Sequence, residues 1–301
     1  MSKATDVSPP ARRSEFMLLA GNALGATRKA LTHNPTTLVG TIIFLLIVVL
    51  AILAPLIAPY DPVAQRIVNR LQGPSWAHWL GTDYYGRDIL SRLLHGARYS
   101  LMIGIASITL AVIIGSLIGL VAGYFGGRID IVIMQIMDVV LAFPALILGI
   151  ILVAVLGASV TNIIIAIAFT AVPAFARIAR APVMVLRERE FVQAGRALGF
   201  SDLRIMFRHI LPNIVPEIIV MASLWMATAV RTEASLAFIG LGIAPPTPTW
   251  GGMVREGFEN ILDSYSVALF PSLAVLVLVL ALNLIGDGLR DAIDPKLAKN
   301  A

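Results

Sequence analysis

Residues 38–59 read LVGTIIFLLIVVLAILAPLIAP and contain no charged side chain. As a helix, this stretch is about 33 Å long, enough to cross the roughly 30 Å hydrocarbon core of a bilayer. Lipid cannot satisfy backbone polar groups, so a stretch this apolar predicts a transmembrane helix. The whole chain agrees, because 58% of its 301 residues are hydrophobic and 14% are charged, against about 45–50% and about 25% in soluble proteins.

The composition also excludes several other classes of protein. The chain has no cysteine, which excludes a disulfide scaffold and thiolate metal sites. Its apolar excess excludes an intrinsically disordered chain. The net charge of +5 is explained by cytoplasmic loops enriched in lysine and arginine. We therefore expect membrane lipid around the protein and no nucleic-acid partner.

Further apolar stretches bring the predicted number of spans to six. They lie at residues 99–127, 131–176 (two spans), 213–230 and 264–286. The two spans within 131–176 are expected to separate at the turn-like sequence of residues 157–162. The apolar residues 234–244 are expected to dip back toward the bilayer after the fifth span, and two half-spans are the alternative. The predicted fold class is an all-α integral membrane protein.

The distribution of basic residues predicts the orientation. Six spans place both termini on one side of the membrane. If that side is the cytoplasm, 16 lysines and arginines are cytoplasmic and 7 are outside. This bias predicts cytoplasmic termini, and the long polar N-terminal segment predicts an uncleaved first span. The expected organisation is a cytoplasmic segment at 1–37, a first span with a long periplasmic loop at 38–99, a five-span core at 100–288, and a cytoplasmic tail at 289–301.

Residues 187–212, REREFVQAGRALGFSDLRIMFRHILP, predict two short amphipathic helices in a cytoplasmic loop. The apolar faces comprise Phe191, Ala194, Gly195 and Leu198 in the first helix, and Leu203, Met206, Phe207 and Ile210 in the second. Gly199 suits the left-handed end of the first helix, and Ser201 suits the N-cap of the second, with Asp202 in its first turn. Leu211-Pro212 is expected to end the second helix. The pattern fits either helices on the membrane surface or a docking element for a cytoplasmic partner.

The same loop resembles the EAA loop of permease subunits from bacterial ABC importers, whose pattern is E-A-A-x3-G-x9-I-x-L-P. The matching residues are Gln193, Ala194, Gly195, Gly199, His209, Ile210, Leu211 and Pro212. Gln193 replaces the usual Glu, Gly195 the second Ala and His209 the usual Ile, but the spacing is intact. The resemblance implies coupling helices that sit in a cleft of an ATPase. The coupling residues would be Gln193, Ala194, Gly195, Arg196, Gly199, Phe200, Ser201, Asp202, His209, Leu211 and Pro212.

Residues 78–101, 122–130, 244–251 and 283–297 are similar to the second (C-type) permease subunit of the peptide and nickel importer subfamily. This resemblance implies a type I ABC importer permease in the bacterial inner membrane, with 100–288 as its permease core. The cargo would be di- or oligopeptides, with nickel or glutathione as alternatives, moved by alternating access. The implied partners are a homologous second permease in a heterodimer, two ATPase subunits or domains, and a periplasmic substrate-binding protein.

The sequence contains no recognisable motif for ATP binding, catalysis or metal binding. Without a G-x-x-x-x-G-K-[ST] phosphate loop, ATP and Mg²⁺ are expected on partner subunits, with no cofactor on this chain. The four histidines, His33, His78, His95 and His209, lack metal-site spacing, so no catalytic or metal-binding residue is expected. An ion-coupled secondary transporter is the rival class, disfavoured because such proteins place ionisable residues on broken helices at the membrane midplane. An ABC exporter is disfavoured by the importer-type loop.

Seven further residues are candidate sites. Asp138, Pro144, Arg231 and Glu233 are candidates for the transport pathway or its gating, because charges are costly in a span and proline kinks a helix. The alternatives are that Asp138 reaches the interface or pairs with Arg128, and that Arg231 and Glu233 form a structural pair. The proline-rich turn with Pro245, Pro246 and Trp250 suits a platform on the outer surface, or an interfacial tryptophan on a rigid turn. The resemblance implies that such outer loops meet the binding protein.

Overall fold

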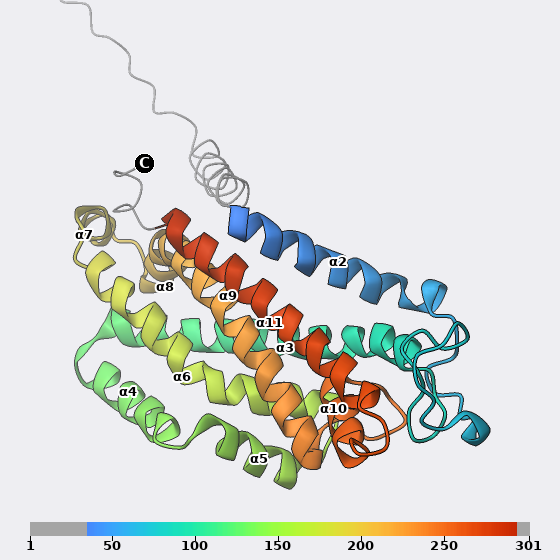
Figure 1. Ribbon diagram of the computed structural model, residues 1–301. Helices are drawn as coiled ribbons and strands as arrows, with labels where there is room; N and C mark the ends of the chain where they lie inside the picture. Colours follow the sequence, from blue (N-terminus) through green and yellow to red (C-terminus); the bar gives the residue numbers. More distant parts are fainter. Residues whose placement is uncertain (1–34, 294–301) are drawn as a thin grey trace, which may run out of the picture.

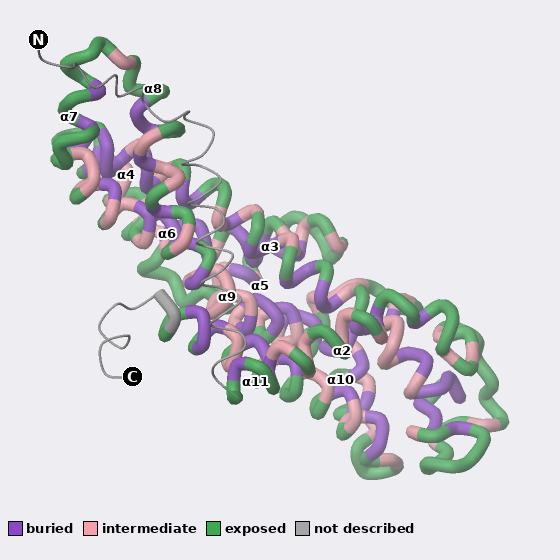
Figure 2. The backbone as a smooth tube through the Cα atoms, turned by 90° about the horizontal axis from the view of Figure 1, so that it is seen from above, coloured by how far each residue is buried: buried purple, intermediate pink, exposed green. Residues whose placement is uncertain are grey.

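The computed structural model describes residues 35–293, with side chains up to Asp291. The long helices are α2 (Pro35–Ile57), α3 (Ile89–Phe125), α6 (Val160–Leu186), α9 (Leu211–Leu236) and α11 (Ser266–Ile293). They run lengthwise beside one another, and α2 packs on α3 and α11 (Figure 1). Buried residues follow the inner faces of α3, α6 and α9 (Figure 2). Residues 1–34 and 294–301, which were predicted to be cytoplasmic, lie outside the described part of the chain.

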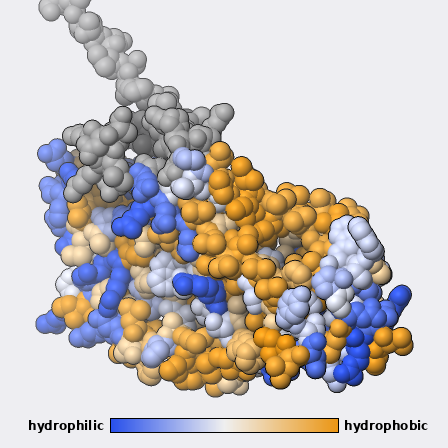
Figure 3. Space-filling view, viewed as in Figure 1, coloured by the Kyte–Doolittle hydropathy of each residue, from blue (hydrophilic) through white to orange (hydrophobic). Residues whose placement is uncertain are grey.

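The shorter elements are α4 (Gly127–Leu141), α5 (Ala145–Leu156), α7 (Glu190–Ala197), α8 (Asp202–Ile205) and α10 (Trp250–Glu259), with turns η1 (Ile67–Asn69), η2 (Met206–Ile210) and η3 (Ala237–Leu241). Helices α7 and α8 lie at one end of the bundle; α10 and the loop at 58–88 lie at the other (Figure 1). Hydrophobic surface covers much of the middle, and hydrophilic surface gathers toward both ends (Figure 3). These features are those of an all-α membrane protein.

Five helices in the described part are long and apolar enough to cross a membrane. A sixth crossing is available if α4 and α5, which are bent by 86° relative to each other, form one span. The break falls at Phe143 and Pro144, because proline cannot donate to the preceding turn and disfavours helical geometry in the residue before it. The kink expected at Pro144 is therefore a complete break. The expected separation near 157–162 is confirmed by Gly157, with a φ of 90°, and by Ser159, which caps α6.

Two expectations about the fifth span are wrong. Leu211-Pro212 does not end the preceding helix, because a π turn at Met206–Ile210 joins α8 to α9 and Pro212 occupies the first turn of α9. Proline is tolerated there since the first-turn N–H groups need no helical acceptor. Residues 234–244 do not form a separate dip, because α9 continues to Leu236 and passes into η3. Gly240, with a φ of 95°, lies in the turn that ends this helical run.

Three glycines spaced four residues apart allow α3 and α6 to pack closely. Gly115, Gly119 and Gly123 lie on one face of α3, against Ala176, Ala179 and Val183 of α6. A β-carbon on Gly119 would collide with the carbonyl oxygen of Ala176. Small residues at this spacing are a common device for close helix contact in membranes.

Gly119→Ala is expected to destabilise the protein by about 1–3 kcal/mol, because the added methyl meets backbone that cannot rotate away. The measurement is thermal unfolding of the purified protein in detergent. Gly149→Ala in α5 is the control, since its β-carbon would meet only Leu236 side-chain atoms, at 3.7 and 3.8 Å. Equal melting temperatures for the two variants would contradict the prediction.

Candidate functional site

The loop between α6 and α9 has the local geometry that the sequence predicted. Gly199 has a φ of 75° and its N–H donates to the carbonyl of Arg196 at 2.9 Å. The next N–H, of Phe200, donates to the carbonyl of Gly195 at 3.0 Å, which closes the end of α7. The Ser201 hydroxyl accepts the N–H of Arg204 at 3.4 Å, as expected for the N-cap of α8. The left-handed glycine and the serine cap are both confirmed.

The loop is fixed to the helix bundle by polar contacts with the end of α3. The Tyr124 hydroxyl donates to Asp202 at 2.6 Å, and the Arg196 guanidinium lies over the Tyr124 ring at 5.3 Å. Arg187 donates to the carbonyl of Gly123 at 3.0 Å. Two predicted coupling residues, Arg196 and Asp202, therefore meet at one tyrosine of a spanning helix. A displacement of the loop must act on α3.

The buried face of α7 differs from the predicted one. Val192 and Gly195 are buried, whereas Phe191 and Leu198 are exposed. Gly195 faces Phe200, to which a β-carbon would come within 3.2 Å. The short helix thus packs through one i, i+3 pair, with Val192 in a buried core that includes residues of α3 and α6, and its larger apolar side chains turn outward.

In the second helix, Met206 and Ile210 are buried as predicted, but Leu203 and Phe207, predicted on the same face, are exposed. We define the coupling face as the exposed apolar residues of this loop: Phe191, Leu198, Leu203 and Phe207, which are 44%, 73%, 65% and 48% exposed. This hydrophobic surface belongs to no core of the described chain.

Phe200 contacts two other residues of the predicted loop. Its ring stacks on His209 at 5.7 Å, and the Arg204 guanidinium lies 4.0 Å from its centroid. Gln193 donates to the carbonyl of Glu188 at 3.1 Å, which closes the turn before α7. Ala194 is exposed, and Leu211 and Pro212 begin α9.

The candidate pathway residues are scattered over the structure. Asp138 on α4 forms an ion pair with Arg177 of α6, so pairing with Arg128 is not observed. Arg231 is exposed and donates to the Thr228 hydroxyl at 3.1 Å. Glu233 is buried and accepts a hydrogen bond from Ser100 at 3.3 Å. Arg231 and Glu233 thus do not form the expected pair, because two residues apart on a helix they point to different sides.

The proline-rich turn is divided between surface and core. Pro245 and Pro246 are exposed, but Trp250 is 3% exposed, so the prediction of an exposed tryptophan platform is wrong. The indole N–H of Trp250 donates to the carbonyl of Leu93 at 2.8 Å. Trp250 therefore anchors α10 to α3.

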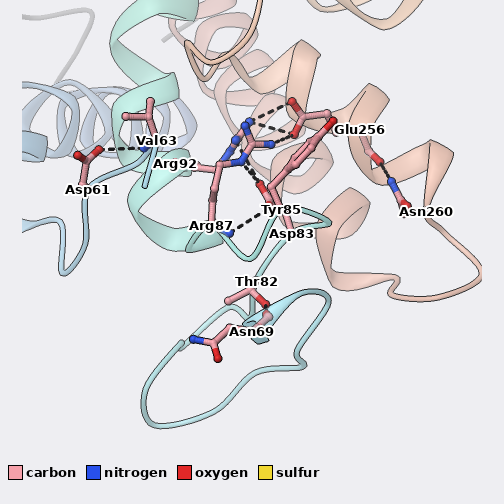
Figure 4. Close-up of polar contacts among 10 residues, drawn as sticks. All are labelled: Asp61, Val63, Asn69, Thr82, Asp83, Tyr85, Arg87, Arg92, Glu256 and Asn260. Atoms are coloured by element: carbon pink, nitrogen blue, oxygen red, sulfur yellow. Dashed lines mark hydrogen bonds and ion pairs between the residues drawn. The ribbon is translucent and has the colours of Figure 1, made fainter. Parts of the chain in front are cut away.

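A buried ionic network that the sequence analysis did not single out lies at the same end of the molecule (Figure 4). Arg87 and Arg92 are each 2% exposed, and both donate to Glu256 of α10, at 2.7 and 3.0 Å. Asp83 accepts the side chain of Arg87 at 2.6 Å and lies 3.2 Å from Arg92. Opposite charges four residues apart beside a span, at Asp83 and Arg87, were the available signal. No pattern in the sequence indicated that Glu256, 164 residues beyond Arg92, would join them.

The network holds the loop at 58–88, which we call the outer cap. Asp83 also accepts the backbone N–H groups of Tyr85 and Arg87 at 2.8 and 3.0 Å. Asp88 caps α3 by accepting the N–H of Ser91 at 2.8 Å, and it lies 2.9 Å from His78. The outer cap is therefore a structured element, fastened to both α3 and α10.

The helix arrangement resembles that of a solved transporter structure. A solved structure described as inward-facing conformations of the MetNI methionine ABC transporter superposes with a TM-score of 0.55, at 18% identity, covering 68% of this chain and 98% of that one. Residues 115–299 match the family described as binding-protein-dependent transport system inner membrane component. Residues 24–74 match the N-terminal transmembrane domain of oligopeptide transport permease C.

The chain belongs to the family of binding-protein-dependent transport system inner membrane components and is a multi-pass permease subunit of an ABC importer. It is 46% identical to a dipeptide transport system permease protein of Alkalihalophilus pseudofirmus over 89% of this chain and 88% of that protein. It is 45% identical to a glutathione transport system permease protein of Pectobacterium atrosepticum, covering 90% of each. A di/tripeptide permease of Pseudomonas aeruginosa is 46% identical, covering 91% of this chain and 92% of that protein. Importers of this family also comprise ATPase and substrate-binding components.

Proposed function

We propose that this subunit carries di- or oligopeptides across the inner membrane, in a heterodimer with a homologous second permease. Two ATPase subunits, which would hold the ATP and Mg²⁺, dock on the cytoplasmic side, and a periplasmic binding protein delivers the peptide. Similarity to permeases named for dipeptides and di/tripeptides supports this cargo. Glutathione, supported by a relative of nearly equal identity, and nickel are the alternatives.

The observation that carries the proposal is the coupling face. Its four apolar side chains are exposed on a loop that is rigidly capped and hydrogen-bonded to α3. Exposed large apolar side chains on a polar end of the molecule are typical of a protein contact, and the resemblance to the EAA loop makes an ATPase the partner. The remaining coupling residues, from Gln193 to Pro212, would serve by fixing the shape of this surface.

The same contacts suggest how ATPase motion reaches the pathway. Tyr124 and Arg187 connect the loop to α3, while the π turn joins it continuously to α9. Closure of the ATPase pair would therefore move α3 and α9 together, as alternating access requires. The break at Pro144 would let α4 and α5 change their angle, and Arg231 and Glu233 would lie near the outer mouth.

The sidedness of the protein follows from the partners. The end with α7 and α8 would face the cytoplasm together with both termini, in agreement with the excess of basic residues there. The outer cap and the exposed Pro245-Pro246 turn would face the periplasm, where the binding protein docks. The apolar middle would be covered by lipid and by the second permease.

Leu203→Asp is expected to reduce the ATPase that co-purifies with the tagged chain at least tenfold, because a carboxylate would be buried in the apolar contact. Leu203→Met is the control, since it keeps a large apolar side chain at the same exposed position. The measurement is affinity purification from native membranes in mild detergent, followed by identification of the retained subunits.

The wild-type chain should retain a second permease and the ATPases in this experiment. Recovery of the chain alone would contradict the docking role and reopen the ion-coupled alternative. Uptake of a labelled dipeptide, of glutathione and of nickel by cells with and without the chain then identifies the cargo.

A further inference from the structure

Two ion pairs join α4 to α6, and their surroundings differ. Asp130 accepts two hydrogen bonds from Arg180 at 2.5 Å, and its side chain is 11% exposed. In the other pair, Arg177 and Asp138 are 53% and 54% exposed. The first pair is protected by the packing of the two helices. The second lies open on the surface of the protomer.

The open pair lies within a spanning helix. Arg177 is roughly 26 Å along α6 from Val160, so a hydrocarbon core about 30 Å thick that begins at Val160 includes it. Two charged side chains exposed to lipid at this position would be costly. Water or a polar partner therefore covers them in the membrane.

The sequence of α4 extends this polar surface. Arg128, Gln135 and Asp138 are all exposed and recur at i, i+7 and i+10, which places them on one face. The opposite side of α4 lies against α3 and lines an apolar groove with it. The groove residues are Leu117, Ile118, Val121, Ile133, Ile136 and Met137. Ile131 and Val139 are also exposed on this side of α4, at 56% and 63%, so the polar side chains form a strip among apolar ones.

We infer that Asp138 and Arg177 form a contact site for a zwitterionic solute at the inner end of the transport pathway. The inference rests on the proposed function, which supplies the pathway between two permeases. A peptide with free ends carries an ammonium and a carboxylate. The ammonium would pair with Asp138 and the carboxylate with the planar guanidinium of Arg177.

Binding of the solute would not change the net charge of the site. In the empty state the two side chains neutralise each other, and the passing solute replaces one ion pair by two. Because both partners are half-exposed, they can separate without unfolding a packed surface, unlike Asp130 and Arg180. Gln135, one turn away, would offer a neutral hydrogen-bonding group beside the site.

The absence of cysteine from the chain permits a direct test. Asp138→Cys, Arg177→Cys and Gln135→Cys are made singly in the full importer and labelled in membrane vesicles with a charged methanethiosulfonate, read as added mass on this chain. All three are expected to react at least tenfold faster than Leu280→Cys, whose side chain on α11 is 51% exposed but apolar. Gln135→Cys leaves the ion pair intact, so its labelling rate tests whether this face is aqueous even if the other variants fold poorly.

A labelling rate equal to that of Leu280→Cys at all three positions would overturn the inference, because the face would not be aqueous. Peptide-loaded binding protein with ATP is expected to slow labelling at least threefold. Reactivity that peptide leaves unchanged would also overturn it, since the face would then be wet without binding the solute.

A transport assay separates this inference from the proposed function. Asp138→Asn and Arg177→Gln are expected to lower uptake of a dipeptide with free ends at least tenfold while the importer still assembles. Asp130→Asn should instead reduce the amount of assembled importer. If the wild-type importer takes up the dipeptide and both site variants take it up at the same rate, the inference is overturned and the proposed function stands. A wild-type importer that takes up no peptide would overturn the proposed function.

Discussion

Gly199→Pro is expected to abolish transport while the chain still inserts in the membrane. Proline fixes φ near −65°, whereas Gly199 has a φ of 75°, and it removes the N–H that donates to Arg196. The turn between α7 and α8 must then open, which costs about 3 kcal/mol or more and displaces the coupling face. Uptake of labelled peptide, together with the amount of chain in washed membranes, measures the two effects separately.

Gly199→Asn is the matched control for this experiment. Asparagine adopts left-handed backbone more readily than other side chains, and the space around Gly199 is open, with nothing within 4 Å of a β-carbon. This variant should retain at least half of the wild-type uptake. Transport by Gly199→Pro at the wild-type rate would show that the loop conformation is not essential for coupling.

Asp83→Ala is expected to destabilise the outer cap by about 3–5 kcal/mol, the usual effect of removing one partner from a buried ionic cluster. Arg87 and Arg92, each 2% exposed, would share Glu256 alone, and two backbone N–H groups would lose their acceptor. Limited proteolysis within residues 58–88, with hydrogen exchange of the same segment, measures the loss of structure.

Asp61→Ala is the control, because Asp61 lies in the same loop but is exposed and accepts only the N–H of Val63 at 2.9 Å. Its effect should stay within about 0.5 kcal/mol. Equal protease sensitivity of the two variants would contradict a structural role for the network. In the proposed orientation the outer cap faces the binding protein, so Asp83→Ala should also weaken delivery of peptide.

The sequence predicted those features that depend on local chemistry. Long uncharged stretches give membrane helices because backbone groups in lipid must bond to one another. Gly199 and Ser201 were identified because a left-handed position and a helix cap each require a particular kind of residue. The spacing of the EAA-like loop carried the resemblance to importer permeases, which the family match bears out.

The predictions that were wrong concern the packing between elements. The buried side of α7 was misassigned because an eight-residue helix can turn either of two apolar faces inward, and Val192, buried in a core with residues of α3 and α6, decides between them. Trp250 was expected outside because nothing in its neighbourhood along the chain reveals Leu93 as its acceptor. Pro212 was expected to stop a helix, but a π turn shifts the helical register so that this proline lies in a first turn.

The sequence by itself thus determined the membrane class, the low-charge stretches that form the spans, and the loop that marks an importer permease. Only the tertiary structure decided which charges meet: Arg87 and Arg92 with Glu256, Asp130 with Arg180, and Asp138 with Arg177. The physical reason is that hydrophobicity and backbone preference act within one turn or one span. The partner of a charged side chain depends on which distant helices lie side by side, here α4 beside α6 and α10 beside α3.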